Sequence, residues 1–293
     1  MHAGPTGRET ELDFPVAVAS VLGMTPERFV EVFRLAALQA GQVARYLQGQ
    51  VEKQEKAGET TAESAALTAV DLAAQDVILH QLWAALPEIR VDAEEDTELV
   101  GRFAGAASDA PLVVIDPVDG TLNYTLGSQD YAVMGALVVR GFYEAAVVAF
   151  PAYAELYFAI RGRGAWVERS GGARERLFAP PPVERVLVSP RVPERAQARL
   201  REVYSDVSVS RCSAVDSSIV GLGRARAAVS EGRSDRRRAI GYLISLECGG
   251  VTWHADHPWA CEDPETLPSS WAPSITADSD RTARRVLELV RGG

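Results

Sequence analysis

Residues 112–124 form the stretch Leu-Val-Val-Ile-Asp-Pro-Val-Asp-Gly-Thr-Leu-Asn-Tyr. Its first four residues are an apolar run, which predicts a short buried strand that the following proline and glycine bring to an end. Asp116 and Asp119 would then lie on a tight turn at the carboxyl end of that strand. The stretch therefore places two carboxylates, a glycine and a hydroxyl at one edge of a predicted sheet.

This set of groups suits metal-assisted phosphate chemistry. Hard divalent cations such as Mg²⁺ prefer oxygen ligands, and a turn can offer carboxylates and a backbone carbonyl to the same ion. The amides of residues 120–122 would follow in a helix-opening turn, which is a favourable seat for an anion. An ordinary Asp-Pro-x-Asp-Gly turn has the same short pattern, so these residues alone leave both interpretations open.

The full stretch resembles the signature Asp-Pro-Ile/Leu-Asp-Gly-Thr-x-Asn-Phe of the inositol monophosphatase family, in the lithium-sensitive, Mg²⁺-dependent sugar-phosphatase superfamily. Val118 and Tyr124 are mild replacements within it. Other family-like elements occur in the expected order at 67–71, 93–96, 131–133, 161–166 and 247–250. The resemblance covers roughly residues 25–290 and implies a layered αβαβα sandwich of the α+β or α/β class.

The resemblance also implies a set of metal ligands. Glu94, Asp116 and the Val118 carbonyl would hold one Mg²⁺, and Asp116 and Asp119 would hold a second. Glu94 lies 22 residues before Asp116, close to the family's separation. By itself Glu94 belongs to an acidic run, which is more typical of a solvated surface.

Catalytic roles follow from the same resemblance. Thr121 would bind the attacking water, and Asp71, which lies 23 residues before Glu94, would orient the threonine hydroxyl. Glu94 would help to polarise the water, and the amides from Gly120 and Thr121 onward would hold phosphate oxygens. Glu231 would contact a substrate hydroxyl, although its alignment requires a one-residue gap.

One position departs from the family pattern. The family has a Trp-Asp-x-Ala element whose Asp lies ten residues before the late Glu, and counting back from Glu247 gives Arg237, preceded by Arg236. Asp235 is the nearest carboxylate, but a shift of two positions turns a helical side chain by about 200°. Arg237 is thus expected either to remove the second metal or to swing away and leave a site with one ligand fewer, and its guanidinium could itself stabilise phosphate charge.

These observations predict a Mg²⁺-dependent phosphomonoesterase that hydrolyses a small polyol or sugar phosphate. A catalytically impaired, phosphate-binding or regulatory pseudo-enzyme is the alternative from another class, because Arg237 disturbs the metal site. A fructose-bisphosphate or nucleotide 3′-phosphate phosphatase is a further alternative, because such relatives share the Asp-Pro-x-Asp-Gly core.

Properties of the whole chain indicate which partners and which cellular compartment to expect. A net charge of −10 argues against nucleic acid as the main partner, and no apolar run approaches the length of a membrane span. Three cysteines without metal-type spacing fit reduced thiols, which indicates a cytoplasmic location. A homodimer is expected only from the resemblance.

Composition and periodicity predict how the chain is organised. Residues 1–22 are expected to form a flexible extension, 23–180 an α+β half with the metal site, and 181–293 an α/β half. Expected helices lie at 25–47, 71–86, 193–204, 216–223, 235–247 and 281–290. Expected strands lie at 112–115, 132–139, 145–150, 155–160, 186–189, 207–210 and 225–230.

Overall fold

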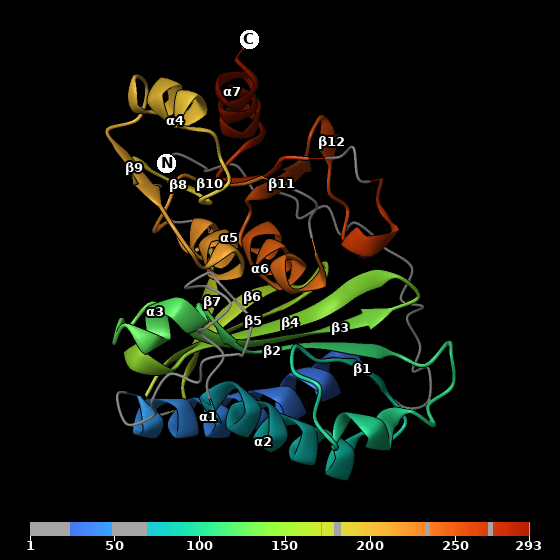
Figure 1. Cartoon of the computed structure of the whole chain (residues 1–293). Coiled ribbons are helices and arrows are strands. Elements are labelled where there is room, and N and C mark those ends of the chain that lie inside the picture. The colour runs from blue at the N-terminus through green and yellow to red at the C-terminus, as the bar shows by residue number, and fades with distance from the viewer. Residues whose placement is uncertain are drawn as a thin grey trace, which may run out of the picture.

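The computed structural model describes residues 24–48, 69–170, 172–178, 183–231, 235–268 and 272–292. The predicted extension at 1–22 and the Leu67-Thr68 part of the upstream family-like element lie outside these ranges. Two sheets and three layers of helices alternate along one direction of the molecule (Figure 1). This arrangement confirms the predicted αβαβα sandwich.

The first sheet contains seven strands in the order in which they occur along the chain. They are β1 (Arg90–Asp92), β2 (Leu112–Asp119), β3 (Ala132–Val139), β4 (Phe142–Phe150), β5 (Glu155–Ile160), β6 (Gly164–Glu168) and β7 (Arg174–Leu177). Only the pairing of β1 with β2 is parallel, and the other pairings are antiparallel. The candidate site therefore lies on β2, beside the edge strand.

The second sheet has the strand order β12-β11-β13-β10-β8-β9. Its strands are β8 (Arg185–Val188), β9 (Asp206–Val209), β10 (Ala227–Ser230), β11 (Val251–His254), β12 (His257–Pro258) and β13 (Ser274–Ala277). Strands β8, β9 and β10 are parallel, and β11, β12 and β13 add antiparallel pairings. The mixed sheet agrees with the α/β character expected for this half.

Helices separate and cover the two sheets (Figure 1). The helices are α1 (Pro26–Leu47), α2 (Ala69–Ala85), α3 (Thr121–Thr125), α4 (Glu194–Arg201), α5 (Ser213–Gly221), α6 (Arg236–Glu247) and α7 (Asp280–Arg291). Helices α1 and α2 cover one face of the first sheet, α5 and α6 lie between the sheets, and α4 and α7 cover the outer face of the second sheet. None of the helices in the described ranges combines the length and apolar character that crossing a bilayer requires.

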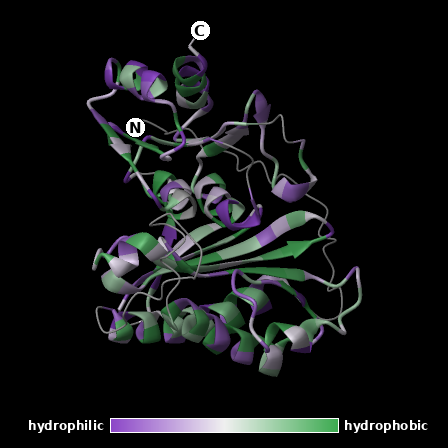
Figure 2. Cartoon of the chain, in the orientation of Figure 1, coloured by the Kyte–Doolittle hydropathy of each residue, from purple (hydrophilic) through white to green (hydrophobic). Residues whose placement is uncertain are grey.

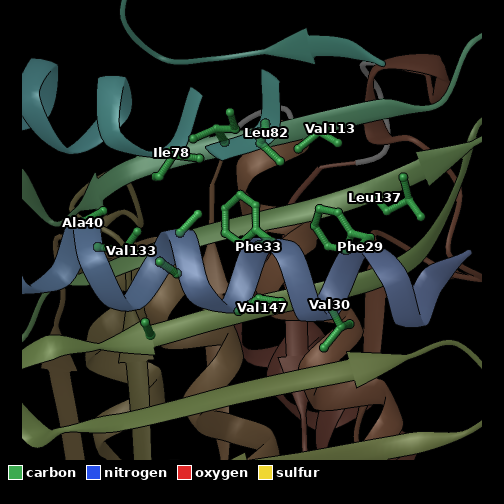
Figure 3. Packing of buried hydrophobic residues seen from close by; sticks show 14 of the residues in the cluster. Phe29, Val30, Phe33, Ala40, Ile78, Leu82, Val113, Val133, Leu137 and Val147 are labelled. Atoms are coloured by element: carbon green, nitrogen blue, oxygen red, sulfur yellow. The ribbon is translucent and has the colours of Figure 1, made fainter. Parts of the chain in front are cut away.

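Helix α1 illustrates how the sequence pattern forms the outer layer. Thr25 caps its first turn, where the Thr25 hydroxyl accepts a hydrogen bond from the Arg28 amide, and Pro26 occupies the first helical position. Phe29 and Phe33 are fully buried and stack with ring centroids 5.3 Å apart (Figure 3). Figure 2 shows hydrophobic residues concentrated in the strands of the first sheet, whereas the helices beneath it carry both hydrophobic and hydrophilic residues. The buried residues of α1 lie on the side that packs against the sheet.

The strand that carries the signature is longer than the sequence predicts. We expected Asp116 and Asp119 on a turn, but β2 continues to Asp119, and the turn begins at Gly120. Asp116 pairs with Met134 and Asp119 with Ala132, so the register shifts between the two carboxylates. Pro117 lies within this irregularity, where the amide that proline lacks is not needed for regular pairing. The prediction of a strand end at Ile115 was therefore wrong.

Six strands were not predicted from the sequence: β1, β6, β7, β11, β12 and β13. Strands β11 and β13 contain buried threonines, Thr252 and Thr276, whose hydroxyls lie 3.0 Å apart and satisfy each other. Polar residues in a sequence do not indicate a buried strand, because the partners that satisfy their hydrogen bonds across the sheet are not visible in the sequence. The predicted boundary at residue 180 falls between β7 and β8, and it stays a prediction.

The contact between α5 and α6 depends on the absence of a side chain at Gly221. A Cβ at this position would lie 2.5 Å from the Ser245 Cα, and the Gly221 amide donates to the Ser245 hydroxyl at 2.9 Å. These helices form the layer that faces the signature strand, so their spacing affects the site.

We expect Gly221→Ala to lower the free energy of unfolding by about 1–3 kcal/mol, because overpacking must separate the two helix backbones. Urea unfolding measures the change. Gly101→Ala is the matched control, because a Cβ there meets nothing within 4 Å, and its effect should stay within about 0.5 kcal/mol. Equal stability of Gly221→Ala and wild type would show that the helices can separate without cost.

Candidate active site

The hydroxyl of Thr121 lies between two oxygen acceptors. It is 3.3 Å from Asp71 Oδ1 and 3.0 Å from the Val118 carbonyl oxygen. Asp71 is buried in the first turn of α2, which brings it to the signature turn from the outer helix layer. Because a hydroxyl has one proton, these acceptors fix its donor direction and leave its lone pairs available to another donor.

Helix α2 also anchors the acidic loop after β1. Gln75 donates to the Glu95 carbonyl at 2.6 Å and accepts from the Glu95 amide at 2.9 Å. Gln75 is fully buried and lies four residues after Asp71, so the two side chains project from the same side of the helix. One helix face therefore positions both Asp71 and the loop that carries Glu94.

Three carboxylates interact electrostatically at the end of β2. Asp116 is 4% exposed, and its Oδ1 has no hydrogen-bond partner among the described residues. Burial and the nearby charges of Glu94 and Asp119 raise the pKa of Asp116 well above its usual value. Burial raises the pKa of Asp119 to about 7, partly offset by the hydrogen bond from the Val215 amide, 2.9 Å from Asp119 Oδ2.

Gly120 allows close approach of the signature turn to α5. Its φ of +85° is a left-handed conformation, and a Cβ would lie 2.4 Å from Cys212 Sγ. Asn123 holds the same junction, because its side-chain amide is 3.1 Å from the Asp130 carbonyl and 2.9 Å from Cys212 Sγ. The turn is thus fixed against the layer between the sheets.

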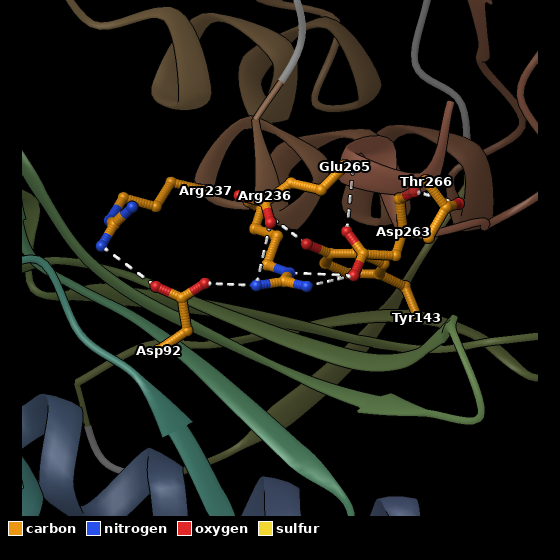
Figure 4. A network of polar contacts seen from close by, with 7 residues as sticks. All are labelled: Asp92, Tyr143, Arg236, Arg237, Asp263, Glu265 and Thr266. Atoms are coloured by element: carbon orange, nitrogen blue, oxygen red, sulfur yellow. Dashed lines mark hydrogen bonds and ion pairs between the residues drawn. The ribbon is translucent and has the colours of Figure 1, made fainter. Parts of the chain in front are cut away.

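An ion-pair network begins at the first turn of α6 (Figure 4). Arg236 contacts Asp263 Oδ2 through Nε and NH2 at 2.8 and 2.7 Å, and its NH1 lies 2.9 Å from Asp92 Oδ2. Arg237 reaches the other oxygen of Asp92, with NH2 3.4 Å from Oδ1. Asp92 thereby connects β1 with both arginines.

The positive charge of Arg237 lowers the pKa of Asp116, in opposition to the stronger effects of burial and Glu94. Its correspondence to the family's metal-ligand position stays a prediction. Asp235 also lies near the site, because its charge contributes to the raised pKa of Asp119. Asp235 caps α6, where its Oδ1 accepts from the Arg238 amide at 3.0 Å.

Other predicted residues have mainly structural contacts. The Glu231 amide donates to the Ser189 hydroxyl at 3.2 Å at the end of β10, and its substrate role stays a prediction. Glu247 accepts hydrogen bonds from the Gly162 and Gly164 amides at 2.7 and 2.8 Å. Two separate family-like elements therefore meet in one contact that ties α6 to the turn between β5 and β6.

The carboxylates near Thr121 are the groups that could hold the implied cation. Across the described ranges, no three His, Cys, Asp or Glu side chains are gathered closely enough to hold a metal ion as they stand. Glu94 is exposed and Asp116 is buried, yet the charges of Glu94 and Asp119 act on Asp116, and one Asp116 oxygen has no partner among the described residues. Oxygen ligands of this kind fit a hard divalent cation, whose charge would relieve the repulsion.

Sequence reasoning missed several residues that support the site. Gln75 had a usable signal, because it lies one helical turn after Asp71. Asp92, Asp263 and Val215 had none, because their roles depend on pairings between elements distant in sequence. The backbone amide of Val215 acts without its side chain, so residue identity could not reveal its contact with Asp119.

Comparisons with known proteins identify relatives of the chain and of its fold. Nus factor SuhB of Xylella fastidiosa is 35% identical over 188 residues, which make up 62% of this chain and 66% of that protein. An IMPase of Thermotoga maritima superimposes with a TM-score of 0.72 at 21% identity, covering 91% of this chain and 97% of its own. An IMPase/NADP phosphatase complexed with Mg²⁺ and phosphate gives a TM-score of 0.72 at 19% identity, with coverages of 92% and 97%.

The two structural matches have low sequence identity and show the fold alone. The family model provides the stronger evidence, because it matches residues 26–290 and so includes the signature strand, the acidic loop and α6. The chain belongs to the inositol monophosphatase family.

Proposed function

We propose that the protein is a Mg²⁺-dependent phosphomonoesterase acting on a small polyol or sugar phosphate. The observation that carries this proposal is the junction of Thr121 with Asp71 and the Val118 carbonyl, beside the buried carboxylates. An oriented hydroxyl next to a site that favours a divalent cation is suited to positioning a water molecule for attack on phosphorus.

Glu94, Asp116, Asp119 and the Val118 carbonyl are the groups that would hold the cation. When bound, Mg²⁺ would lower the pKa of the attacking water and offset charge on the phosphate and the leaving oxygen. A structural relative has been solved with Mg²⁺ and phosphate, which supports the assignment for this chain.

The side chains and backbone groups of the site would act mainly by orienting the attacking water and the phosphate. Asp71 and the Val118 carbonyl accept from the Thr121 hydroxyl, whose lone pairs can then accept a hydrogen bond from water. Attack forms a phosphorus–oxygen bond and breaks the bond to the leaving alcohol, which takes up a proton. Backbone amides at Gly120 and Thr121 are proposed to hold the phosphate oxygens.

A second candidate function is binding without catalysis. The relative from Xylella is named a Nus factor, and in this chain Arg237 brings a positive charge toward Asp116. Partnership with the transcription machinery is therefore an alternative role. A cytoplasmic location and a homodimer stay predictions, as do fructose-bisphosphate and nucleotide 3′-phosphate substrates.

Phosphate release from small phosphate esters separates these functions. The panel contains inositol, glycerol and hexose monophosphates, fructose bisphosphate and a nucleotide 3′-phosphate, each with and without MgCl₂. Mg²⁺-dependent release from a polyol or sugar monophosphate supports the proposed phosphatase. Absence of release from every ester would contradict it and favour the binding role.

Thr121→Ala should reduce turnover on the order of 10²-fold while changing Mg²⁺ affinity little, because it removes an orienting hydroxyl but no charge. Steady-state kinetics and calorimetry measure the two effects. Thr125→Ala is the matched control, because the Thr125 hydroxyl bonds the Leu122 carbonyl at 2.9 Å in the same short helix. Equal turnover of the two variants would assign Thr121 a purely local structural role.

The raised pKa of Asp119 predicts that the free energy of unfolding of the metal-free protein depends on pH. Between its usual value of 3.8 and about 7, the folded state binds the proton more tightly, so stability falls as the pH rises through this window. Asp119→Asn should therefore unfold at a higher temperature than wild type at pH 8, and the two should converge near pH 4.

Thermal unfolding in chelator measures this difference. Addition of MgCl₂ at pH 8 should stabilise wild type more than Asp119→Asn, because binding to the folded state adds stability and the variant lacks one ligand charge. A variant that is no more stable than wild type at pH 8 would show that the Asp119 carboxylate is not under electrostatic strain.

A further inference from the structure

A groove runs along one side of α1, on the outer face of the first sheet. Helix α1 packs mainly on β3, β4 and β5. The groove has a volume of about 260 Å³, and its other walls are the turn between β4 and β5 and residues 168–170 at the end of β6. Its size is close to that of the smaller sites that bind small molecules in proteins.

One wall of the groove is fixed by a close contact between α1 and the turn after β4. This turn is the 3₁₀ helix η3 (Pro151–Tyr153), and a Cβ on Gly41 of α1 would lie 2.9 Å from the Pro151 Cγ. The Tyr153 hydroxyl donates to Asp130 Oδ1 at 2.8 Å and so ties the turn to the segment before β3. Helix and turn are therefore held in place, and the groove between them is preformed.

Part of the lining is apolar. Ala37, Ala149 and Pro151 are buried where they border the groove, whereas Leu38 is 37% exposed. An apolar ligand in the groove would cover Leu38 and remove its surface from water, which is favourable. The apolar lining therefore favours a ligand with a hydrocarbon part.

The two carboxylates of the lining already have cationic partners. Glu155 lies 2.7 Å from Arg224 through Oε2 and 3.3 Å from Arg169 through Oε1. Glu168 Oε1 accepts a hydrogen bond from Arg34 at 2.9 Å. Because these negative charges are balanced within the protein, the groove does not favour a cationic ligand.

Arg45 is a charged residue of the lining that lacks such a partner. It belongs to the last turn of α1, and its exposed side chain makes no ion pair or hydrogen bond with any residue in the described ranges. Gln42 precedes it by three residues and also lines the groove, so two groups of donors lie on the same side of the helix. An unpaired guanidinium beside balanced carboxylates favours an anionic group on the ligand.

We propose that this groove is a binding site for a small amphipathic carboxylate, whose charged end pairs with Arg45 and whose apolar chain covers Leu38. Leu38 precedes Arg45 by seven residues, which separates their backbones by about 10 Å along the helix axis. Side chains of a helix tilt toward its amino end, so the Arg45 guanidinium shortens this distance and a chain of medium length spans the rest. None of the residues near Thr121 lines the groove, and the inference does not rest on the proposed function.

Binding of octanoate tests the inference. Saturation-transfer NMR at neutral pH, with ionised octanoate well below saturation, gives a signal that is proportional to affinity. For so small a ligand we expect a dissociation constant on the order of a few millimolar. 1-Octanol has the same chain without the charge, and its signal should be about a tenth of the octanoate signal, because a charge-assisted hydrogen bond is lost.

Two variants locate the ligand in the groove. Arg45→Gln should reduce the octanoate signal about tenfold and leave the octanol signal unchanged. Leu38→Ser should reduce both signals, because either chain loses the same apolar contact. Leu35→Ser removes another exposed leucine of α1 that does not line the groove, and Arg281→Gln removes an exposed charge from α7. Both controls should bind octanoate as wild type does, and thermal unfolding verifies that each variant is folded.

Several results overturn the inference. No octanoate signal with wild type, or a signal undiminished in Arg45→Gln or in Leu38→Ser, would show that the groove does not bind a carboxylate in this way. An octanoate signal no greater than that of octanol would show that Arg45 does not select a charged ligand. In analytical ultracentrifugation, a dimer that is lost in Leu38→Ser but retained in Leu35→Ser would show that a second copy of the chain covers the groove instead.

Discussion

The constraint on which the site depends is the burial of Asp116 beside other negative charges at the end of one strand. Asp116 and Asp119 lie on β2 between two packed helix layers, with Glu94 close enough to raise the pKa of both. Such an arrangement is unfavourable for folding unless protons or cations relieve it. The surrounding structure keeps these groups in place through contacts made by residues outside the cluster.

Those supporting contacts come from three directions. Helix α2 fixes the acidic loop through Gln75, α5 donates the Val215 amide to Asp119, and α6 brings Arg237 toward Asp116. The two main apolar clusters lie on opposite faces of the first sheet, and one of them includes residues of α5 and α6. The core on both sides of the sheet therefore determines the distances among the charges, which links packing to the proposed chemistry.

The sequence predicted the layered fold and several local details of the site. The signature identified the strand, and the family resemblance associated Asp71 and Glu94 with it; in the structure Asp71 lies beside Thr121. The extension of β2 through its irregularity was not predicted, because Pro117 normally ends a regular strand. The role of Asp92 could not be inferred either, because it depends on how β1 meets α6.

The shared face of α2 has a mechanical consequence for the molecule. Asp71 orients the Thr121 hydroxyl, and Gln75, one turn further on, holds both backbone polar groups of Glu95. A rotation of this helix about its axis would displace both contacts together, since they lie on the same face. Substitution of buried residues that pack against α2, although distant from any reacting group, would therefore shift the Thr121 hydroxyl and the acidic loop together.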